Sequence, residues 1–293
     1  MSPDTRAALE AAVVAAFGPG RPIARISSAG GGCIHDSYVV DSGSERLFVK
    51  TNRAALEDAF AAEADGLEAL IGAGMRAPRP LGQGVAEDRA FLVMEFLELR
   101  GSGDWAAMGR ALAAMHRRTG GSFGWRRDNF IGATPQANPG HDDWIAFWRD
   151  ARLLPQLELA VRNGFGPTLI DSGEKLAESL PKLLGARAPE ASLLHGDLWS
   201  GNAAFLADGS PVLFDPAVYC GDREADLAMT ELFGGFPRDF RAAYAEAWPL
   251  DAGYPLRRNL YNLYHVLNHA NLFGGGYAAQ AQAMIGRLLS EAR

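Results

Sequence analysis

Cysteine, long apolar runs and positive charge are all scarce in this 293-residue sequence. Two cysteines, Cys33 and Cys220, cannot form a disulfide framework or a four-cysteine zinc site. No apolar stretch approaches the roughly 20 residues that span a bilayer, and no basic start leads into a cleavable signal. The net charge of -7 disfavours nucleic acid and anionic membranes as partners, because both bind clustered lysine and arginine. We therefore expect a cytoplasmic globular protein with neither partner.

What the sequence does contain is a polar loop followed by two short apolar runs, between Leu193 and Asp215. Asp197 is followed five positions later by Asn202, and Asp215 comes directly after the second apolar run. An Asp-Gly pair at 208–209 separates the two runs and favours a tight hairpin with a primed turn. We expect this hairpin to bring Asp197, Asn202 and Asp215 to neighbouring strand ends, where their side chains converge.

That convergence is typical of phosphoryl transfer, which depends mainly on positioning and on metal charge. The spacing of Asp197 and Asn202 matches the catalytic loop of kinases, in which the aspartate orients the acceptor hydroxyl and the asparagine holds a metal. Asp215 stands where a second metal-binding carboxylate is expected. We interpret Asp197 as the catalytic base, and Asn202 and Asp215 as metal ligands.

The sequence of the N-terminal part is typical of a small β-sheet unit that binds a nucleotide. Lys50 ends the third expected strand and Glu63 lies on the next helix, as in the lysine–glutamate pair of kinases. Glu57, Asp58 and Glu68 are the competing acids on that helix. The expected strands cover 23–29, 37–40, 46–50 and 90–94, and the expected helices cover 4–17 and 54–71.

Two further segments of this part are candidates for nucleotide contacts. Residues 30–35 form a glycine-rich turn whose backbone could approach a phosphate closely. The strand at 90–94 runs into Glu95, Phe96 and Leu97, the expected hinge that reads the adenine. The boundary between the two lobes is placed near residue 98, which gives lobes of 1–97 and 98–293.

The C-terminal part is predicted to be mostly helical. Its long loop from 120 to 140 carries Asp128 and Asn129, which we interpret as substrate-related. Asp226 is expected to brace the backbone of the catalytic loop, whereas Glu224 is interpreted as an acid at a helix N-terminus. His265 and His269 lack the rest of a zinc motif and are interpreted as core or capping residues. The expected helices cover 105–116, 144–161, 169–184, 227–233, 256–272 and 277–292.

Several motifs together resemble the fructosamine kinase (ketosamine 3-kinase) family across nearly the whole chain. They include His195-Gly-Asp-Leu-Trp-Ser-Gly-Asn202, Phe214-Asp-Pro-Ala217 and the charged run after Gly221. Trp199 separates the chain from aminoglycoside and choline kinases, which are similar only at His-Gly-Asp and Asn. The resemblance implies an α+β, two-lobed protein-kinase-like fold with a small antiparallel sheet lobe, one main helix and a larger helical lobe.

The resemblance also implies ATP- and Mg²⁺-dependent phosphorylation of the 3-hydroxyl of a ketosamine, a sugar joined to an amine by glycation. The 3-phosphate makes that adduct prone to elimination, so the implied role is deglycation repair. Carried onto matching positions, the resemblance implies that Asp197 is the base, that Asn202 and Asp215 hold metal, that Lys50 and Glu63 form the nucleotide pair, and that Glu95, Phe96 and Leu97 supply the hinge. We further expect Gly31, Gly32 and Cys33 at the phosphates, Trp199 against the sugar, and His195 and Asp226 behind the catalytic loop. Cys33 is further implied to be redox-sensitive, and His35-Asp36 departs from the expected glycine loop.

Two alternatives stay open at this point. One is a kinase of another small hydroxyl compound, such as an aminoglycoside or a choline-like amino alcohol. The other is a nucleotide-binding pseudokinase that acts as a redox sensor. A sensor has no need for a catalytic base, so this alternative is disfavoured by the retention of Lys50, Asp197, Asn202 and Asp215. The sugar, the amine and the choice between monomer and homodimer are not determined by the sequence.

Overall fold

The computed structural model describes residues 1–30, 35–185 and 187–293. These residues form two compact units. The first comprises Met1–Asp104 and Ala203–Pro216, and the second comprises Trp105–Asn202 and Ala217–Arg293. Residues 203–216 thus belong with the N-terminal unit, whereas the expected division into 1–97 and 98–293 places them in the second lobe.

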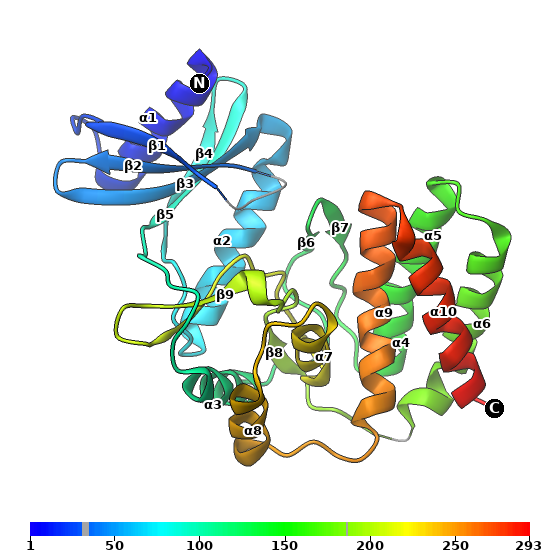
Figure 1. Ribbon diagram of the computed structural model, residues 1–293. Helices are drawn as coiled ribbons and strands as arrows, with labels where there is room; N and C mark the ends of the chain where they lie inside the picture. Colours follow the sequence, from blue (N-terminus) through cyan, green and yellow to red (C-terminus); the bar gives the residue numbers. More distant parts are fainter. Residues whose placement is uncertain (31–34, 186) are drawn as a thin grey trace. The chain divides into compact units, whose positions relative to one another are not determined.

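The first unit is built on a five-stranded antiparallel sheet with the strand order β1-β2-β3-β5-β4 (Figure 1). Helix α1 packs its residues Ala8, Leu9, Ala12 and Val13 against one face of the sheet, where Val49 of β3 lies. Lys50 follows Val49 on the same strand, so its side chain points to the opposite face. The elements are α1 (Pro3–Phe17), β1 (Arg25–Ala29), β2 (Asp36–Ser42), β3 (Glu45–Arg53), a 3₁₀ turn (Ala54–Leu56), α2 (Glu57–Gly72), β4 (Pro80–Ala86) and β5 (Arg89–Glu95).

Strand β4 is absent from the sequence-based expectation, and its composition explains why. It begins at Pro80 and contains Gly82 and Gly84, residues that weaken a strand signal. The strand lies at the edge of the sheet, where proline is tolerated, and its pairing shifts register between Pro80 and Gly82. A side chain at Gly82 would meet Ala15 Cβ at 2.8 Å, so this glycine lets α1 approach the sheet closely.

The expected hairpin after the catalytic loop is present, but its turn differs from the prediction. Strands β9 (Ala203–Phe205) and β10 (Pro211–Leu213) pair antiparallel. The primed turn is wrong, because both primed types need positive φ at the first central residue, Asp208, and only Gly209 has it, at 85°. The Leu206 carbonyl accepts from Gly209 N at 3.0 Å and Leu206 N donates to Ser210 O at 2.9 Å, which makes a longer loop.

Backbone hydrogen bonds explain why this hairpin belongs to the first unit. Arg100 N donates to Phe205 O at 2.8 Å, and Phe205 N donates back to Arg100 O at 2.9 Å. Leu213 N donates to Arg76 O at 3.0 Å. The strand edges of the hairpin are therefore paired with segments that lie more than a hundred residues earlier in the chain.

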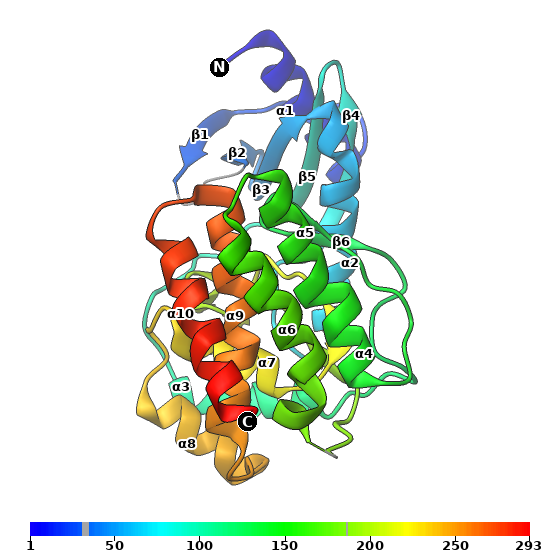
Figure 2. The same ribbon diagram turned by 90° about the vertical axis from the view of Figure 1, so that its right-hand side faces the viewer.

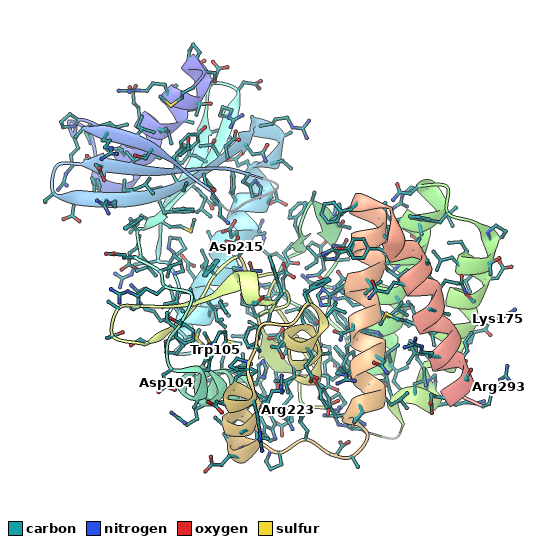
Figure 3. All side chains as sticks on the ribbon, viewed as in Figure 1. Asp104, Trp105, Lys175, Asp215, Arg223 and Arg293 are labelled. Carbon is teal, nitrogen blue, oxygen red and sulfur yellow. The ribbon has the colours of Figure 1, made fainter. Side chains whose placement is uncertain are left out.

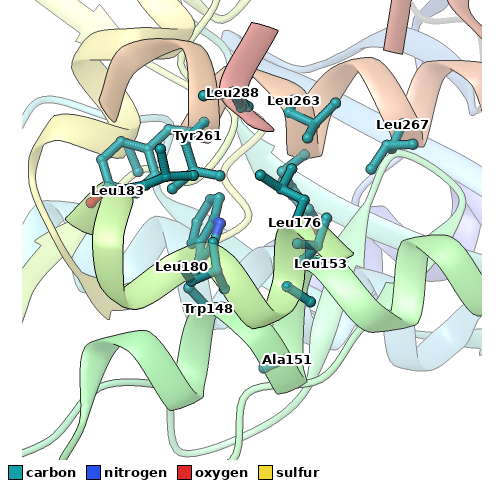
Figure 4. Packing of buried hydrophobic residues seen from close by; sticks show 14 of the residues in the cluster. Trp148, Ala151, Leu153, Leu176, Leu180, Leu183, Tyr261, Leu263, Leu267 and Leu288 are labelled. Atoms are coloured by element: carbon teal, nitrogen blue, oxygen red, sulfur yellow. The ribbon is translucent and has the colours of Figure 1, made fainter. Parts of the chain in front are cut away.

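The second unit is mostly helical, and its core lies between α4, α6, α9 and α10 (Figure 4). Figure 2 shows α10 lying alongside α9 and α6. The helices are α3 (Trp105–His116), α4 (Trp144–Trp148), α5 (Leu154–Arg162), α6 (Pro167–Leu184), α7 (Glu224–Leu232), α8 (Arg238–Ala247), α9 (Tyr254–Phe273) and α10 (Gly276–Glu291). The short strands are β6 (Asn129–Ile131), β7 (Thr134–Gln136), β8 (Ser192–Leu194) and β11 (Tyr219–Gly221), and a 3₁₀ turn spans Ser200–Asn202.

Two helices differ from the expectation in this unit. The helix expected over 144–161 is interrupted by a π-helical turn at Arg149–Leu153, because Pro155 has no N–H to bond the Ala151 carbonyl. Arg152 Nη1 donates to that carbonyl at 2.8 Å instead. Helix α8 was not expected, since it buries only Phe240, Ala243 and Tyr244 and its apolar stripe is short. Among the described helices none is long and apolar enough to cross a bilayer.

A buried ion cluster ties α7 to α9 in this unit. Glu224 is fully buried, and its carboxylate accepts from Arg257 Nε at 2.6 Å and Nη2 at 2.9 Å. Arg187 lies 3.3 Å from the same carboxylate and also pairs with Asp222. Glu224 lies in the first turn of α7, as the sequence suggested, and it also neutralises buried arginine.

This cluster gives a stability prediction with a matched control. Arg257→Met leaves Glu224 without its bidentate partner and should lower the free energy of unfolding by about 3 kcal/mol. Arg258→Met removes a more exposed pair with Glu231, 2.7 Å long, and should cost at most about 1 kcal/mol. Urea unfolding followed by tryptophan fluorescence measures both, because all six tryptophans lie in the second unit. Equal losses would contradict the role assigned to Arg257.

His265 gives a pH dependence. Burial, with the charges of His269 and Arg152, lowers the pKa of His265 to about 3, against the opposing charge of Asp226. The unfolded chain binds the proton near the ordinary value of 6.5, so the unfolded state holds more protons between these values. Stability is then fully present above pH 6.5 and is lost as the pH falls. We expect wild type to lose about 2 kcal/mol more than His265→Gln between pH 7.5 and 5; parallel curves would contradict this.

Candidate active site

The first unit holds a buried lysine between two carboxylates. Lys50 Nζ on β3 lies 2.6 Å from Glu63 Oε1 on α2 and 2.6 Å from Asp215 Oδ1. Burial alone would lower the pKa of Lys50, but the charges of Asp215 and Glu63 raise it above the ordinary value. Burial raises the pKa of Glu63, and the ammonium of Lys50 opposes that rise. The structure thus pairs Lys50 with Glu63 rather than with Glu57, Asp58 or Glu68.

Asp215 has an unusual backbone for its residue type. Its φ of 56° lies in the left-handed region, which non-glycine residues rarely adopt. Its side chain remains 45% exposed although one oxygen contacts Lys50. Figure 3 marks Asp215, which follows β10 in the first unit. A strained backbone that holds a half-exposed carboxylate next to a buried cation is typical of a functional site.

His35, at the end of the glycine-rich turn, has a defined tautomer. Arg53 N donates to Asn52 Oδ1 at 2.8 Å, so the Asn52 amide nitrogen faces His35 Nδ1 at 2.9 Å. Nδ1 therefore accepts, and the ring proton is on Nε2. Burial, followed by the charge of Lys50, lowers the pKa of His35 to about 4. Gly31, Gly32 and Cys33 lie outside the described residues, so their phosphate contacts and the redox role of Cys33 stay predictions.

At the expected hinge, the side chain of Glu95 is already engaged. Arg76 binds its carboxylate through two contacts, Nη2 to Oε1 at 2.6 Å and Nη1 to Oε2 at 2.9 Å. These hydrogen bonds from Arg76 lower the pKa of Glu95. The guanidinium of Arg46 lies 4.9 Å from the centre of the Phe96 ring. Adenine recognition by residues 95–97 stays a prediction that would use the backbone rather than the carboxylate.

The second unit holds the catalytic loop, which begins after β8. Asn202 Nδ2 donates to Asp197 O at 2.9 Å and lies 3.3 Å from Asp197 Oδ2. Trp199 N donates to Asp197 O, and Asn202 N donates to Trp199 O, which closes a compact turn. Since the amide nitrogen of Asn202 faces Asp197, Oδ1 is the atom that could hold a metal.

Glycine at 196 is required by the close approach of two backbone segments in this unit. Its φ is 83°, and a Cβ there would lie 2.0 Å from Ala217 O. Ala217 N in turn donates to His195 O at 2.8 Å. The catalytic loop and the segment after Asp215 are therefore locked together by main-chain contacts.

Asp226 holds the same loop from behind. Its carboxylate accepts from His195 N at 2.7 Å and from Gly196 N at 2.9 Å. Burial would raise the pKa of Asp226, but hydrogen bonds from His116 and from the Gly196 backbone hold it below the usual range. His195 is fully buried, and its Nδ1 accepts from Asp197 N at 3.2 Å. Both residues contact the loop in the way that a supporting role requires.

Trp199 is the exposed aromatic residue of the loop. Its side chain is 39% exposed. The indole lies directly over Gly201, where a Cβ would meet Trp199 Cη2 at 2.2 Å. The glycine thus leaves room for the indole ring, which an alanine at this position would displace.

The loop from 120 to 140 is connected to the site through its side chains. Asn129 Nδ2 donates to Val218 O at 2.7 Å, and its Oδ1 accepts from Gln136 Nε2 at 2.7 Å. Tyr264 OH donates to Gln136 Oε1 at 2.6 Å. Asp128 Oδ1 accepts from Asn138 N at 2.8 Å. The amide of Asn129 is therefore engaged by protein, and a substrate contact by Asp128 or Asn129 stays a prediction.

Sequence reasoning missed Gln136, Tyr264 and Arg152 as supports of this region. Arg152 is fully buried, and no carboxylate within the described ranges pairs with it. Its guanidinium donates to Ala137 O and Asn138 Oδ1, each at 2.7 Å, and lies 4.1 Å from the centre of the Tyr219 ring. The local sequence signals only an amphipathic helix here, because the partners of Arg152 lie in a different segment.

The structure thus assembles the candidate residues in two groups. Lys50, Glu63 and Asp215 are together in the first unit, and Asp197, Asn202 and Trp199 are together in the second. An amide oxygen and a half-exposed carboxylate are donors that suit Mg²⁺. The convergence of Asp197, Asn202 and Asp215 on one point stays a prediction.

Comparison with known proteins identifies the class first. The fold matches aminoglycoside phosphotransferase APH(4)-Ia with a TM-score of 0.63 at 17% identity, covering 97% of this chain and 98% of that one. The protein therefore has the protein-kinase-like fold of small-molecule phosphotransferases. Residues 6–291 match the fructosamine kinase family. The chain belongs to that family.

Individual relatives agree with this assignment. A protein of Synechocystis sp. named as a ketoamine kinase is 49% identical over 269 residues, 89% of each chain. The chloroplastic protein-ribulosamine 3-kinase of Arabidopsis thaliana is 44% identical over 276 residues, 92% of this chain and 83% of that protein. The solved structure of a Haemophilus somnus protein described as a fructosamine-3-kinase matches with a TM-score of 0.89 at 27% identity, over 98% of this chain and all of that one.

The Lys50–Glu63 pair generates a prediction with a control on the same helix. Glu63→Gln removes the charge that holds the ammonium on the α2 side and leaves Lys50 drawn to Asp215. We expect kcat/KM for ATP to fall roughly 10- to 100-fold, the loss typical of one buried charge-assisted hydrogen bond. Glu68→Gln, at an exposed position of α2, should leave kcat/KM unchanged. Steady-state kinetics at saturating acceptor would contradict the pairing if both variants behaved alike.

Proposed function

We propose that this protein transfers the γ-phosphoryl group of ATP to the 3-hydroxyl of a ketosamine. The observation that carries phosphoryl transfer is the buried ammonium of Lys50, held 2.6 Å from Glu63. Membership of the fructosamine kinase family supports the ketosamine as acceptor. The 3-phosphate of the product promotes elimination of the sugar, so the proposed role is deglycation repair.

In the proposed reaction Asp197 orients the acceptor hydroxyl. The 3-oxygen forms a bond to the γ-phosphorus, the bond from that phosphorus to the β–γ bridging oxygen breaks, and the hydroxyl proton passes to the carboxylate of Asp197. Because the transition state is loose, Asp197 needs to be well positioned rather than strongly basic. The hydrogen bonds that fix Asn202 and the loop backbone to Asp197 supply that positioning.

The nucleotide is proposed to bind in the first unit. Lys50 would contact its phosphates, with Glu63 fixing the position of the ammonium. Asn202 Oδ1 and the Asp215 carboxylate would hold Mg²⁺, which when bound neutralises charge on the transferred group. In that state Asp215 would exchange part of its contact with Lys50 for the ion. Backbone groups of 95–97 would bind the adenine.

On the acceptor side, we place the sugar against Trp199. An indole that is 39% exposed beside the base offers a flat apolar face to a sugar ring. A cytoplasmic location and the state of assembly, monomer or homodimer, remain expectations from the sequence.

The test is coupled ATP turnover with ribulosyl-lysine, fructosyl-lysine, choline and kanamycin as acceptors. We expect turnover on a ketosamine that falls roughly 10²- to 10⁴-fold in Asp197→Asn. Asp208→Asn, an exposed aspartate of the β9–β10 loop, is the matched control and should retain activity. Turnover on choline or kanamycin alone would reassign the acceptor, and nucleotide binding without any turnover would favour the sensor.

The same assay tests the place of Trp199. Trp199→Phe should raise KM for the ketosamine and leave KM for ATP as in wild type. An unchanged KM for the ketosamine would remove Trp199 from the proposed acceptor site.

A further inference from the structure

A chain of buried hydrogen bonds leads to the catalytic loop through Asp226. His116, the last residue of α3, is fully buried. Its Nε2 lies 3.1 Å from Asp226 Oδ2, and its Nδ1 lies 2.8 Å from the hydroxyl of Tyr244 on α8. Asp226 is the residue whose carboxylate accepts from His195 N and Gly196 N. His116 therefore stands one contact away from the loop that carries Asp197.

When the His116 ring is neutral, the donors along this chain have one direction. Arg223 Nη1 lies 3.2 Å from the Tyr244 oxygen, and a guanidinium can only donate, so that oxygen accepts there. The single hydroxyl proton of Tyr244 is then directed to His116 Nδ1, which accepts. The ring proton of His116 must be on Nε2, and it is donated to Asp226. An imidazolium would instead compete with Arg223 for the Tyr244 oxygen.

The far end of the chain is also fixed. Arg223 donates from Nη2 to Pro249 O at 2.6 Å and from Nη1 to Trp248 O at 3.1 Å. Its guanidinium lies 4.1 Å from the centre of the Trp248 ring. Figure 3 marks Arg223, which immediately precedes α7. The carbonyls of Trp248 and Pro249, which follow α8, thus hold Arg223 in place. Arg223 in turn sets the direction of the hydrogen bonds from Tyr244 to His116 and from His116 to Asp226.

We propose that His116, in its Nε2–H form, is a positioning residue for Asp197 that acts through Asp226 and is set by Tyr244 and Arg223. The proposal rests on the proposed function, since it assigns Asp197 as the base. The physical reason is the number of donors on Asp226. Its two oxygens accept from two loop amides and one imidazole, and removal of the imidazole frees the carboxylate to rotate away from the amides.

The distinguishing variant is Tyr244→Phe, which removes one hydroxyl and keeps the packed ring. We expect kcat to fall roughly 10-fold with KM for ATP and for the acceptor unchanged, because a small misplacement of the base costs rate rather than binding. Tyr261→Phe is the matched control. It deletes another buried hydroxyl of the second unit, which bonds Asp222 at 2.7 Å and accepts from Trp144 Nε1 at 3.0 Å. That control should leave kcat as in wild type.

Substitutions of His116 itself separate polarity from volume. His116→Gln keeps an acceptor for Tyr244 and a donor for Asp226, whereas His116→Leu keeps neither. We expect kcat to fall roughly 100-fold in His116→Leu and to be largely retained in His116→Gln. Equal losses in the two variants, or a kcat of Tyr244→Phe no lower than that of Tyr261→Phe, would overturn the proposal.

A readout independent of turnover is the ¹⁵N NMR spectrum of the histidines, in which protonated and unprotonated ring nitrogens have well-separated shifts. The His116 signal, assigned by its absence in His116→Gln, should show a protonated Nε2 and an unprotonated Nδ1. A protonated Nδ1 would overturn the proposal. If wild type turned over no acceptor, the proposed function would fail. The nitrogen shifts would then still show which ring nitrogen of His116 is protonated, and so whether the hydrogen-bond chain has the proposed direction.

Discussion

The removal of charge from water is the constraint on which this structure depends. An ionised group loses several kcal/mol of hydration when it is buried, and only well-placed partners offset that loss. Lys50 is balanced by Glu63 and Asp215, and Glu224 by Arg257 and Arg187. Arg152 uses two oxygens of the loop before α4 and the face of Tyr219 instead of a carboxylate. The contacts of Lys50 with Asp215, of Glu224 with Arg257 and of Arg152 with Tyr219 join segments that are distant in the sequence, so the buried charges also define the tertiary fold.

The same constraint orders the catalytic loop. Asp226 remains a carboxylate inside the protein because backbone N–H groups and an imidazole surround it. Those backbone groups belong to the residues directly before Asp197, so the buried charge of Asp226 and the backbone that leads into Asp197 are parts of one arrangement. A change that weakens the hydrogen bonds of Asp226 therefore lowers the stability of the buried carboxylate and also loosens the backbone that positions Asp197.

The sequence predicts the elements whose signals are local. The alternation around Val49 and Lys50 and the apolar stripe of α2 are enough to place Lys50 and Glu63 on facing elements. The spacing of Asp197 and Asn202 is likewise local, and the structure joins their side chains. Strand β4 was not predicted because its proline and glycines weaken the strand signal, and helix α8 was not predicted because its apolar stripe is short. The π-helical turn was not predicted either, and there the buried guanidinium of Arg152 bonds the Ala151 carbonyl, which Pro155 has no N–H to bond.

What the sequence could not predict is pairing over long separations. The turn at Asp208-Gly209 has a strong local signal for primed geometry, yet the strands it joins bond to Arg76 and Arg100, and the loop is longer. The network from Tyr264 through Gln136 to Asn129 spans more than a hundred residues. Amides and hydroxyls of this kind give no periodic pattern, so their partners become visible only when the backbone is in place.

The assignment of residues 203–216 to the first unit has a consequence for how the protein can be divided. The chain passes from one unit to the other after Asp104, after Asn202 and after Pro216. A gene fragment that ended at Asp104 would encode the sheet without its hairpin and would leave Lys50 with one of its two counter-charges. No single cut separates two complete units, because a cut after Asp104 leaves the first unit without its hairpin and a cut after Pro216 leaves the second unit without residues 105–202.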